Sequence, residues 1–119
     1  RVITVWERAE AVPAWVPVPA GQLRLAEDAE REARAALERV VAELPNAEAA
    51  FLHGDPAEEL ARESQFADCL VIGSRDYGPA PAVLLGGVGE QVARTAECPL
   101  IVVPHGVREP LSPTALTYA

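Results

Sequence analysis

The sequence contains no lysine, so all 10 of its basic side chains are arginines, and 18 acidic residues leave a formal net charge of −8. This shortage of positive charge argues against a nucleic-acid-binding domain, which needs a basic face for phosphates. Long hydrophobic runs are also missing, since no stretch reaches the ~18 apolar residues of a membrane span. The first residues lack the charged and apolar regions of a secretory signal. The composition therefore predicts a soluble, cytoplasmic domain that binds neither nucleic acid nor membrane.

Cysteine is scarce, and the separation of Cys69 and Cys98 matches no metal-binding motif. In a reducing compartment we expect two buried, reduced thiols, and a disulfide is geometrically open only if their strands are neighbours. The residue types of a hydrolytic triad occur as Ser74, Asp76 and His53. Their spacing gives no geometry, however, and Ser74 does not sit in a nucleophile elbow. We therefore predict that the chain is not an enzyme and holds no metal.

Short apolar runs alternate with helical patterns along the chain. The runs predict strands at residues 2–6, 47–53, 69–72 and 100–103, and helices at residues 22–44, 56–65 and from 86–87 onward. Such alternation is typical of a parallel sheet with helices on its faces. We therefore predict one three-layer α/β domain over residues 1–105. A tail without periodicity follows at residues 106–119.

Local signals mark the ends and faces of these helices. Asp55 is suited to an N-cap, Pro56 to the first helical position, and Glu58 to a capping box. The long helix carries an apolar stripe that we expect to face the sheet, namely Leu25, Ala29, Ala33, Ala36, Leu37, Val40, Val41 and Leu44. We expect Trp15, in the proline-rich segment before this helix, to pack on a sheet edge; the alternative is that it covers a pocket mouth.

A glycine-flanked loop is the best candidate for a ligand site. The strand before it ends at Gly73, and the loop closes at Gly86 and Gly87, where a helix begins. In open α/β sheets this arrangement places a loop and a helix N-terminus at the carboxyl edge of the strands, where anionic ligands often bind. We therefore expect any ligand to bind within residues 68–104.

The runs IGSRDYGP, LLGGV and AECPLIVVP, in this order, resemble the C-terminal half of a universal stress protein domain. VITVW is similar to the second strand of that family, and HGDPAEELARES to its third strand end and third helix. The order and spacing of elements match across nearly the whole chain up to Pro104. The resemblance implies a Rossmann-like fold of the adenine-nucleotide alpha-hydrolase type, with strand order 3-2-1-4-5.

The resemblance also implies which residues would contact a nucleotide, ATP or AMP: Val5, Gly73, Asp76, Gly86, Gly87 and Val88. The chain departs from the family's phosphate-binding pattern because Asp76 replaces a glycine and Gly87 replaces a serine or threonine. A carboxylate beside a phosphate repels it by roughly 1–4 kcal/mol. A lost hydrogen bond to a charged group costs about 1.5–3 kcal/mol. No cofactor is therefore certain, and we expect nucleotide binding to be weak or absent.

The family's first strand and first helix have no counterpart before residue 1. In the family that strand lies at the sheet centre, and an aspartate at its end contacts adenine and ribose. Without it, VITVW and CLVIG share no neighbour, and we expect the missing segment to be supplied by another polypeptide piece or to have been lost.

Two functions remain open at this point. One is a non-catalytic stress-response module that acts through partner binding or through a homodimer, in which the exposed last strand, LIVV, pairs across a two-fold axis. The other is an ATP-binding sensor of small molecules. We favour the first because the phosphate-binding pattern is incomplete.

Overall fold

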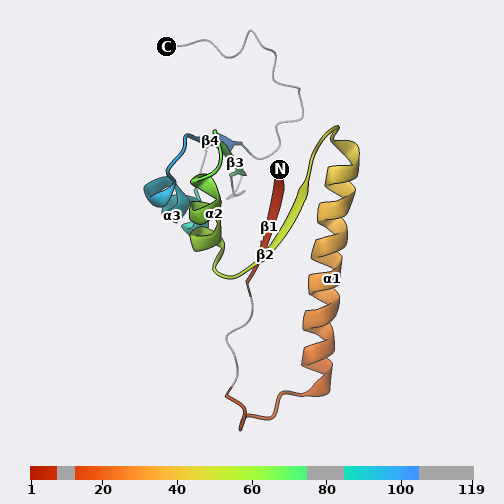
Figure 1. Ribbon diagram of the computed structural model, residues 1–119. Helices are drawn as coiled ribbons and strands as arrows, with labels where there is room; N and C mark the ends of the chain where they lie inside the picture. Colours follow the sequence, from red (N-terminus) through yellow and green to blue (C-terminus); the bar gives the residue numbers. More distant parts are fainter. Residues whose placement is uncertain (8–12, 75–84, 105–119) are drawn as a thin grey trace.

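The computed structural model describes residues 1–7, 13–74 and 85–104. Within these ranges the elements are β1 (Val2–Trp6), α1 (Ala20–Glu43), β2 (Ala49–His53), α2 (Pro56–Ser64), β3 (Leu70–Gly73), α3 (Gly87–Thr95) and β4 (Leu100–Val103) (Figure 1). The alternation of strands and helices predicted from the sequence is confirmed, with ends shifted by one or two residues. The predicted tail at residues 106–119 lies outside the described residues.

The strands form two separate parallel pairs. β1 pairs with β2 along residues 2–6 and 49–53, and β3 pairs with β4 along residues 70–73 and 100–103. No strand in the described ranges joins β1 to β3, as expected for two strands without a shared neighbour. Parallel strands joined by helices make this an α/β protein. The five-strand order inferred from the resemblance stays a prediction.

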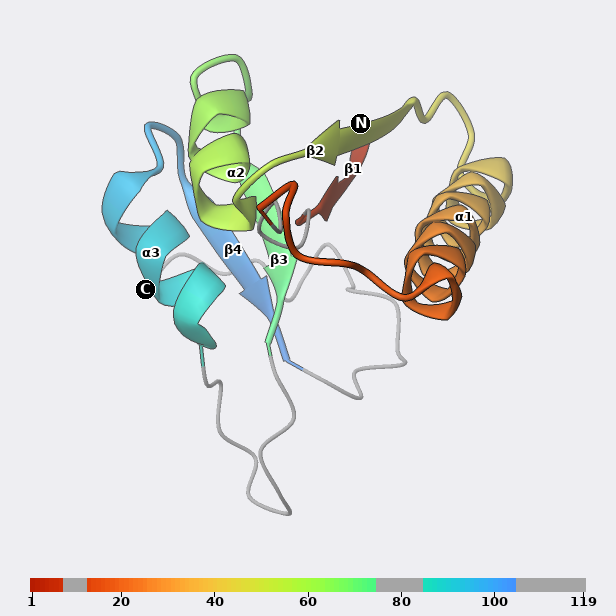
Figure 2. The ribbon, with the colours of Figure 1, turned by 90° about the horizontal axis from the view of Figure 1, so that it is seen from below.

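The main hydrophobic core lies between α2, α3 and the β3–β4 pair. Val92 of α3 is 0% exposed, and Ala57 of α2 and Leu70 of β3 are 4% and 8% exposed. Half-buried apolar side chains surround them: Leu60, Ile72, Ala96, Cys98 and Leu100. Figure 2 shows α2 and α3 together beside β3 and β4. Because side chains alternate along a strand, Leu70 faces these helices while Val71 faces away and is 57% exposed.

Side-chain hydrogen bonds fix both ends of α2. The carboxylate of Asp55 accepts from the backbone N–H of Glu58 at 2.9 Å, which confirms the predicted N-cap. At the other end, the buried hydroxyl of Ser64 donates to the carbonyl of Ala61 at 2.6 Å and accepts from the N–H of Glu97 at 2.9 Å. These bonds tie α2 to the segment before β4.

The predicted apolar stripe of α1 is buried only in part, and Ala33, Ala36 and Val41 are half-buried. Leu37 is 4% exposed, but Leu25, Val40 and Leu44 are 71%, 48% and 47% exposed. Leu25 is exposed because α1 contacts the β1–β2 pair while its N-terminal half extends beyond these two strands (Figure 1). A helical period reports which residues share a face, whereas burial needs an element opposite that face.

Two single-residue expectations are also wrong. Trp15 is 83% exposed and so does not pack on a sheet edge. Cys69 is an exposed free thiol, while Cys98 is a half-buried free thiol. Cys69 immediately precedes β3 and lines an open cavity beside that strand, which leaves its side chain exposed. That both thiols are reduced stays a prediction.

Candidate functional site

The site predicted from the sequence lies where β3 ends and α3 begins. Gly73 is the last residue of β3, and Gly86 is the N-cap residue of α3. A pocket of about 150 Å³ opens here, lined by Leu60, Ile72, Gly73, Gly86, Val88, Gly89 and Val92. The fold therefore brings three of the predicted contact residues, Gly73, Gly86 and Val88, around one hollow.

The other predicted contacts are not gathered there. Val5 lies on β1 opposite Leu52 and does not line the pocket. Gly87 begins α3 but is not among the lining residues. Asp76 lies outside the described residues, so its place at the site stays a prediction.

The N-terminus of α3 lies at the edge of the pocket, which Gly86, Val88 and Gly89 line. Gly86 makes no side-chain cap, and the first bond of the helix runs from the N–H of Glu90 to the carbonyl of Gly86 at 2.9 Å. The N–H groups of Gly87, Val88 and Gly89 therefore have no partner within the helix. Such donors, together with the helix dipole, attract an anion. The carboxylate of Glu90, in the same first turn, opposes that attraction.

Space for side chains differs among these glycines. A Cβ built on Gly87 or on Gly73 meets no atom within 4 Å. A Cβ on Gly89 would lie 3.0 Å from Cδ2 of Leu85 and 3.5 Å from Cδ1 of Ile72. The backbone at Gly87 therefore has room for a hydroxyl-bearing side chain, so the departure from the phosphate-binding pattern there is chemical and not steric.

A larger cavity, of about 690 Å³, lies between the two strand pairs. It is lined on one side by residues 1–3 and on the other by residues 66–73. A salt bridge of 2.8 Å between Arg1 and Glu63 lies at its wall. No sequence motif predicted this cavity. The sequence pointed to it only through the expectation that no strand lies between VITVW (β1) and CLVIG (β3).

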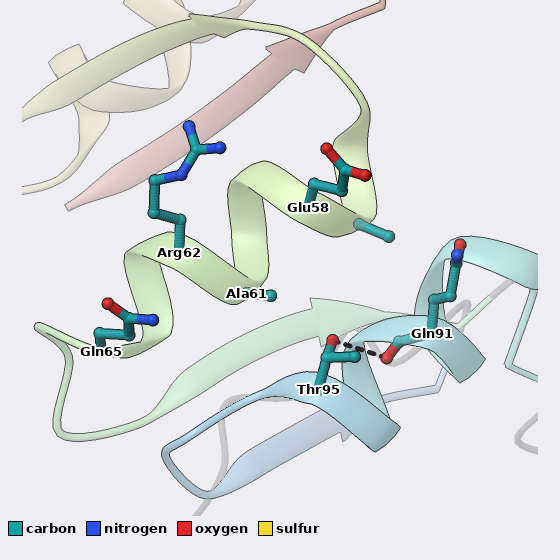
Figure 3. A pocket seen from close by; sticks show the side chains of 7 residues that line it. Glu58, Ala61, Arg62, Gln65, Gln91 and Thr95 are labelled. Atoms are coloured by element: carbon teal, nitrogen blue, oxygen red, sulfur yellow. Dashed lines mark hydrogen bonds between the residues drawn. The ribbon is translucent and has the colours of Figure 1, made fainter.

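A third hollow, of about 360 Å³, lies between α2 and α3 (Figure 3). Its polar lining comes from Glu58 and Arg62 of α2, from the C-cap residue Gln65, and from Gln91 and Thr95 of α3. Arg62 pairs with Glu59 at 2.8 Å, and the Thr95 hydroxyl donates to the carbonyl of Gln91 at 2.8 Å. The Arg62 and Thr95 side chains thus bond within their own helices, and Nε2 of Gln65 donates to Oε1 of Glu97 at 3.1 Å.

The suspected triad is not assembled in the described structure. Nε2 of His53 lies 2.6 Å from a carboxylate oxygen of Glu30 on α1. Ser74 follows β3 in the other strand pair, and Asp76 is not described. Among the described residues, no three histidine, cysteine or acidic side chains gather closely enough to hold a metal ion. No helix there has the length and apolar character to cross a membrane.

Parallel strands with helical crossovers, and a pocket where a strand end meets a helix N-terminus, define an α/β protein of the Rossmann-like class. Residues 1–104 match the universal stress protein family, and the chain belongs to that family. It is similar to the universal stress proteins MT2698 of Mycobacterium tuberculosis (strain CDC 1551 / Oshkosh) and Rv2623 of Mycobacterium tuberculosis (strain ATCC 25618 / H37Rv). Each is 38% identical over 79 residues, which are 66% of this chain and 23% of the relative. The chain thus spans about a quarter of the length of these curated relatives.

Proposed function

We propose that the chain is a non-catalytic stress-response module that acts through dimerisation or partner binding and binds nucleotide weakly or not at all. The observation that carries this proposal is the uncapped start of α3, where Gly87 stands in place of a hydroxyl-bearing residue. Val5, which the resemblance assigns to the nucleotide site, lies outside the pocket at Gly73 and Gly86. The proposal includes a cytoplasmic location.

The proposal also extends to the sheet. In it, a strand that fills the space between β1 and β3 completes a three-layer domain with strand order 3-2-1-4-5. The two parallel pairs support this, because they leave a 690 Å³ cavity between β1 and β3.

The alternative function, an ATP-binding sensor of small molecules, has its own support. The N–H groups of Gly87, Val88 and Gly89 have no partner within α3, and a pocket adjoins them. An anionic phosphate is the group such a helix terminus favours. Direct titration separates the two functions.

We predict that calorimetric titration with ATP gives no binding in the low-micromolar range. Gly87→Ser should raise the affinity by roughly tenfold, because the hydroxyl adds a hydrogen bond to a phosphate oxygen and its Cβ meets nothing within 4 Å. Gly21→Ser is the matched control, since Gly21 lies in the first turn of α1 with equally open space, and it should leave the affinity unchanged.

Two outcomes of that titration are decisive. Nanomolar to low-micromolar affinity in the unaltered chain would defeat the proposal in favour of the sensor. Combining Gly87→Ser with Asp76→Gly tests the loop further, since it removes the predicted repulsion as well. No gain in this double variant would show that the part of the pocket beyond the loop limits binding.

We predict a homodimer through the outer edge of β4. The N–H of Leu70 donates to the carbonyl of Pro99 at 2.9 Å, and the N–H of Ser74 to that of Val103 at 2.8 Å. By the alternation of a parallel ladder, the N–H of Val102 faces away from β3 and is open to a second chain. Light scattering should give twice the chain mass of 12.7 kDa. Val102→Pro, which removes that donor, should return the mass to one chain, and a monomeric parent would contradict the prediction.

A further inference from the structure

The groove between α2 and α3 is a surface to which the proposed nucleotide and dimer sites assign no role (Figure 3). Its lining extends over about two turns of α2, from Ala57 to the C-cap residue Gln65, and over about one turn of α3, from Gln91 to Thr95. Its volume is about 360 Å³, and most of the side chains along it are exposed. An open groove along two neighbouring helices is accessible to a macromolecule, and another helix can pack there by ridge-into-groove contact.

Small side chains form the floor of the groove. Ala57 is 4% exposed and Ala61 is half-buried. The two alanines are four residues apart on α2, so they lie in one row along the helix, and Figure 3 shows the side chain of Ala61 directed toward α3. Because methyl groups leave this row low, the side chains of another helix can enter between α2 and α3 and contact both. The shape of the groove therefore favours a helix that presents a ridge of apolar side chains.

The wall of the groove on α2 carries an unmatched negative charge. The guanidinium of Arg62 donates to both carboxylate oxygens of Glu59, at 2.8 Å and 3.0 Å. The carboxylate of Glu58, by contrast, makes no hydrogen bond or ion pair within the described part of the chain. Together α2 and α3 contain four glutamates and two arginines. Charge complementarity therefore favours a partner with a cationic side chain opposite Glu58.

We propose that the groove between α2 and α3 binds a basic amphipathic helix of a partner protein. The helix lays leucine and alanine side chains over Ala57 and Ala61 and places a lysine or arginine against Glu58. Gln91 and Thr95 form the polar rim on the opposite wall. The formal net charge of −8 attracts such a helix at long range as well. This proposal rests on the proposed role in partner binding and names the chemistry of the partner.

An NMR titration of the isotope-labelled chain locates the binding surface. The probe is a peptide of about 18 residues, long enough to form a helix, with leucine and alanine on one helical face and lysine along both borders of that face. Its addition should shift the amide resonances of Ala61, Gln91 and Thr95. The amides of Val5 and Leu52, which are partners in the β1–β2 ladder, are the internal control and should not shift. Unchanged resonances along the groove at millimolar peptide would overturn the proposal.

Reversal of the charge at Glu58 tests the proposed ion pair. Glu58→Lys should weaken binding of the fluorescently labelled peptide by at least about tenfold in anisotropy, because like charges then face each other. A second peptide with glutamate in place of lysine should bind this variant more tightly than it binds the unaltered chain. Glu38→Lys on α1 is the matched control, since it changes the net charge equally at an exposed site, and it should lower the affinity by less than about threefold. Equal losses in the two variants would overturn the proposal, because net charge alone would then account for binding.

Two further measurements test the shape of the groove and the helical form of its occupant. Ala61→Gln places a longer side chain on the floor and should weaken peptide binding by at least about tenfold. A peptide with proline at its centre, which breaks the helix, should bind the unaltered chain at least about tenfold more weakly than the first peptide. This second measurement holds even if Ala61→Gln does not fold. Equal binding of the two peptides would overturn the proposal of a helical occupant.

The variant Val102→Pro separates this proposal from the proposed dimer. It should abolish the dimer and leave peptide binding unchanged. Loss of peptide binding in Val102→Pro, with none in Glu58→Lys, would place the peptide at β4 and overturn the proposal. A dimer that Glu58→Lys disrupts would identify a second copy of the chain as the occupant and overturn it too. Tight ATP binding bears on the proposed function alone, so the two proposals can fail separately.

Discussion

Replacing Val92 with aspartate is expected to unfold the half of the protein built from α2, α3, β3 and β4. Val92 is 0% exposed and packs with Ala57 and Leu70 at the centre of this core. A carboxylate there would be buried without a partner, at a cost of several kcal/mol. Small domains are stabilised by only about 5–15 kcal/mol in total. Urea unfolding followed by circular dichroism should show a midpoint close to zero denaturant.

Two companion variants make this expectation specific to burial. Val88 lies one turn earlier on the same helix and is 36% exposed, so Val88→Asp should change the free energy of unfolding by about 1 kcal/mol or less. Val92→Ala removes two methyl groups without adding charge and should cost about 1–3 kcal/mol. If Val92→Asp and Val88→Asp unfolded at the same urea concentration, the core would not be centred on Val92.

The elements of this fold were predictable because their signals are local. Asp55 and Pro56 marked the start of α2 by capping chemistry, and the apolar run LVIG marked β3. The burial of individual side chains was less predictable, because it depends on which element packs against each helix face. Leu25 shares the stripe of Leu37, yet it is 71% exposed because it falls on the half of α1 that extends beyond β1 and β2.

The part of the candidate site that lies on the single segment from β3 to α3 was predictable from the sequence. Gly73 and Gly86 bracket a single strand–loop–helix segment, and both line the same pocket. Val5 belongs to the other strand pair, and its place relative to Gly73 depends on what fills the space between β1 and β3. The resemblance assigned Val5 to the nucleotide site on the basis of one continuous sheet. The described strands form two separate pairs instead. Local sequence patterns do not determine the distance between β1 and β3.

The same spacing bears on nucleotide binding. A strand between β1 and β3 would fix the distance from Val5 to Gly73, and so would decide whether the pocket at α3 extends to a nucleotide's base. The phosphate end depends instead on Gly86 and Gly87, which lie on one continuous segment with α3. A hydroxyl at position 87 should therefore act on ATP affinity through the phosphate end alone.

Replacing Gly54 with valine is expected to cost about 3 kcal/mol of folding free energy, because of backbone strain and side-chain crowding. Gly54 joins β2 to α2 with a φ of 150°, a conformation that suits glycine. A Cβ there would lie 2.9 Å from Oε1 and 3.1 Å from Cγ of Glu59, whose carboxylate is held by Arg62 at 2.8 Å. The N–H of Gly54 also donates to the carbonyl of Trp6 at 3.1 Å, so the strain would act on the β1–β2 pair. Urea unfolding measures the loss.

Gly21→Val is the matched control for this turn. Gly21 lies in the first turn of α1, and a Cβ there meets no atom within 4 Å. Valine is a slightly better helix former than glycine, so stability should stay the same or rise by a few tenths of a kcal/mol. Equal stabilities for Gly54→Val and Gly21→Val would mean that the turn adopts another conformation at little cost. The turn would then not fix α2 against β1.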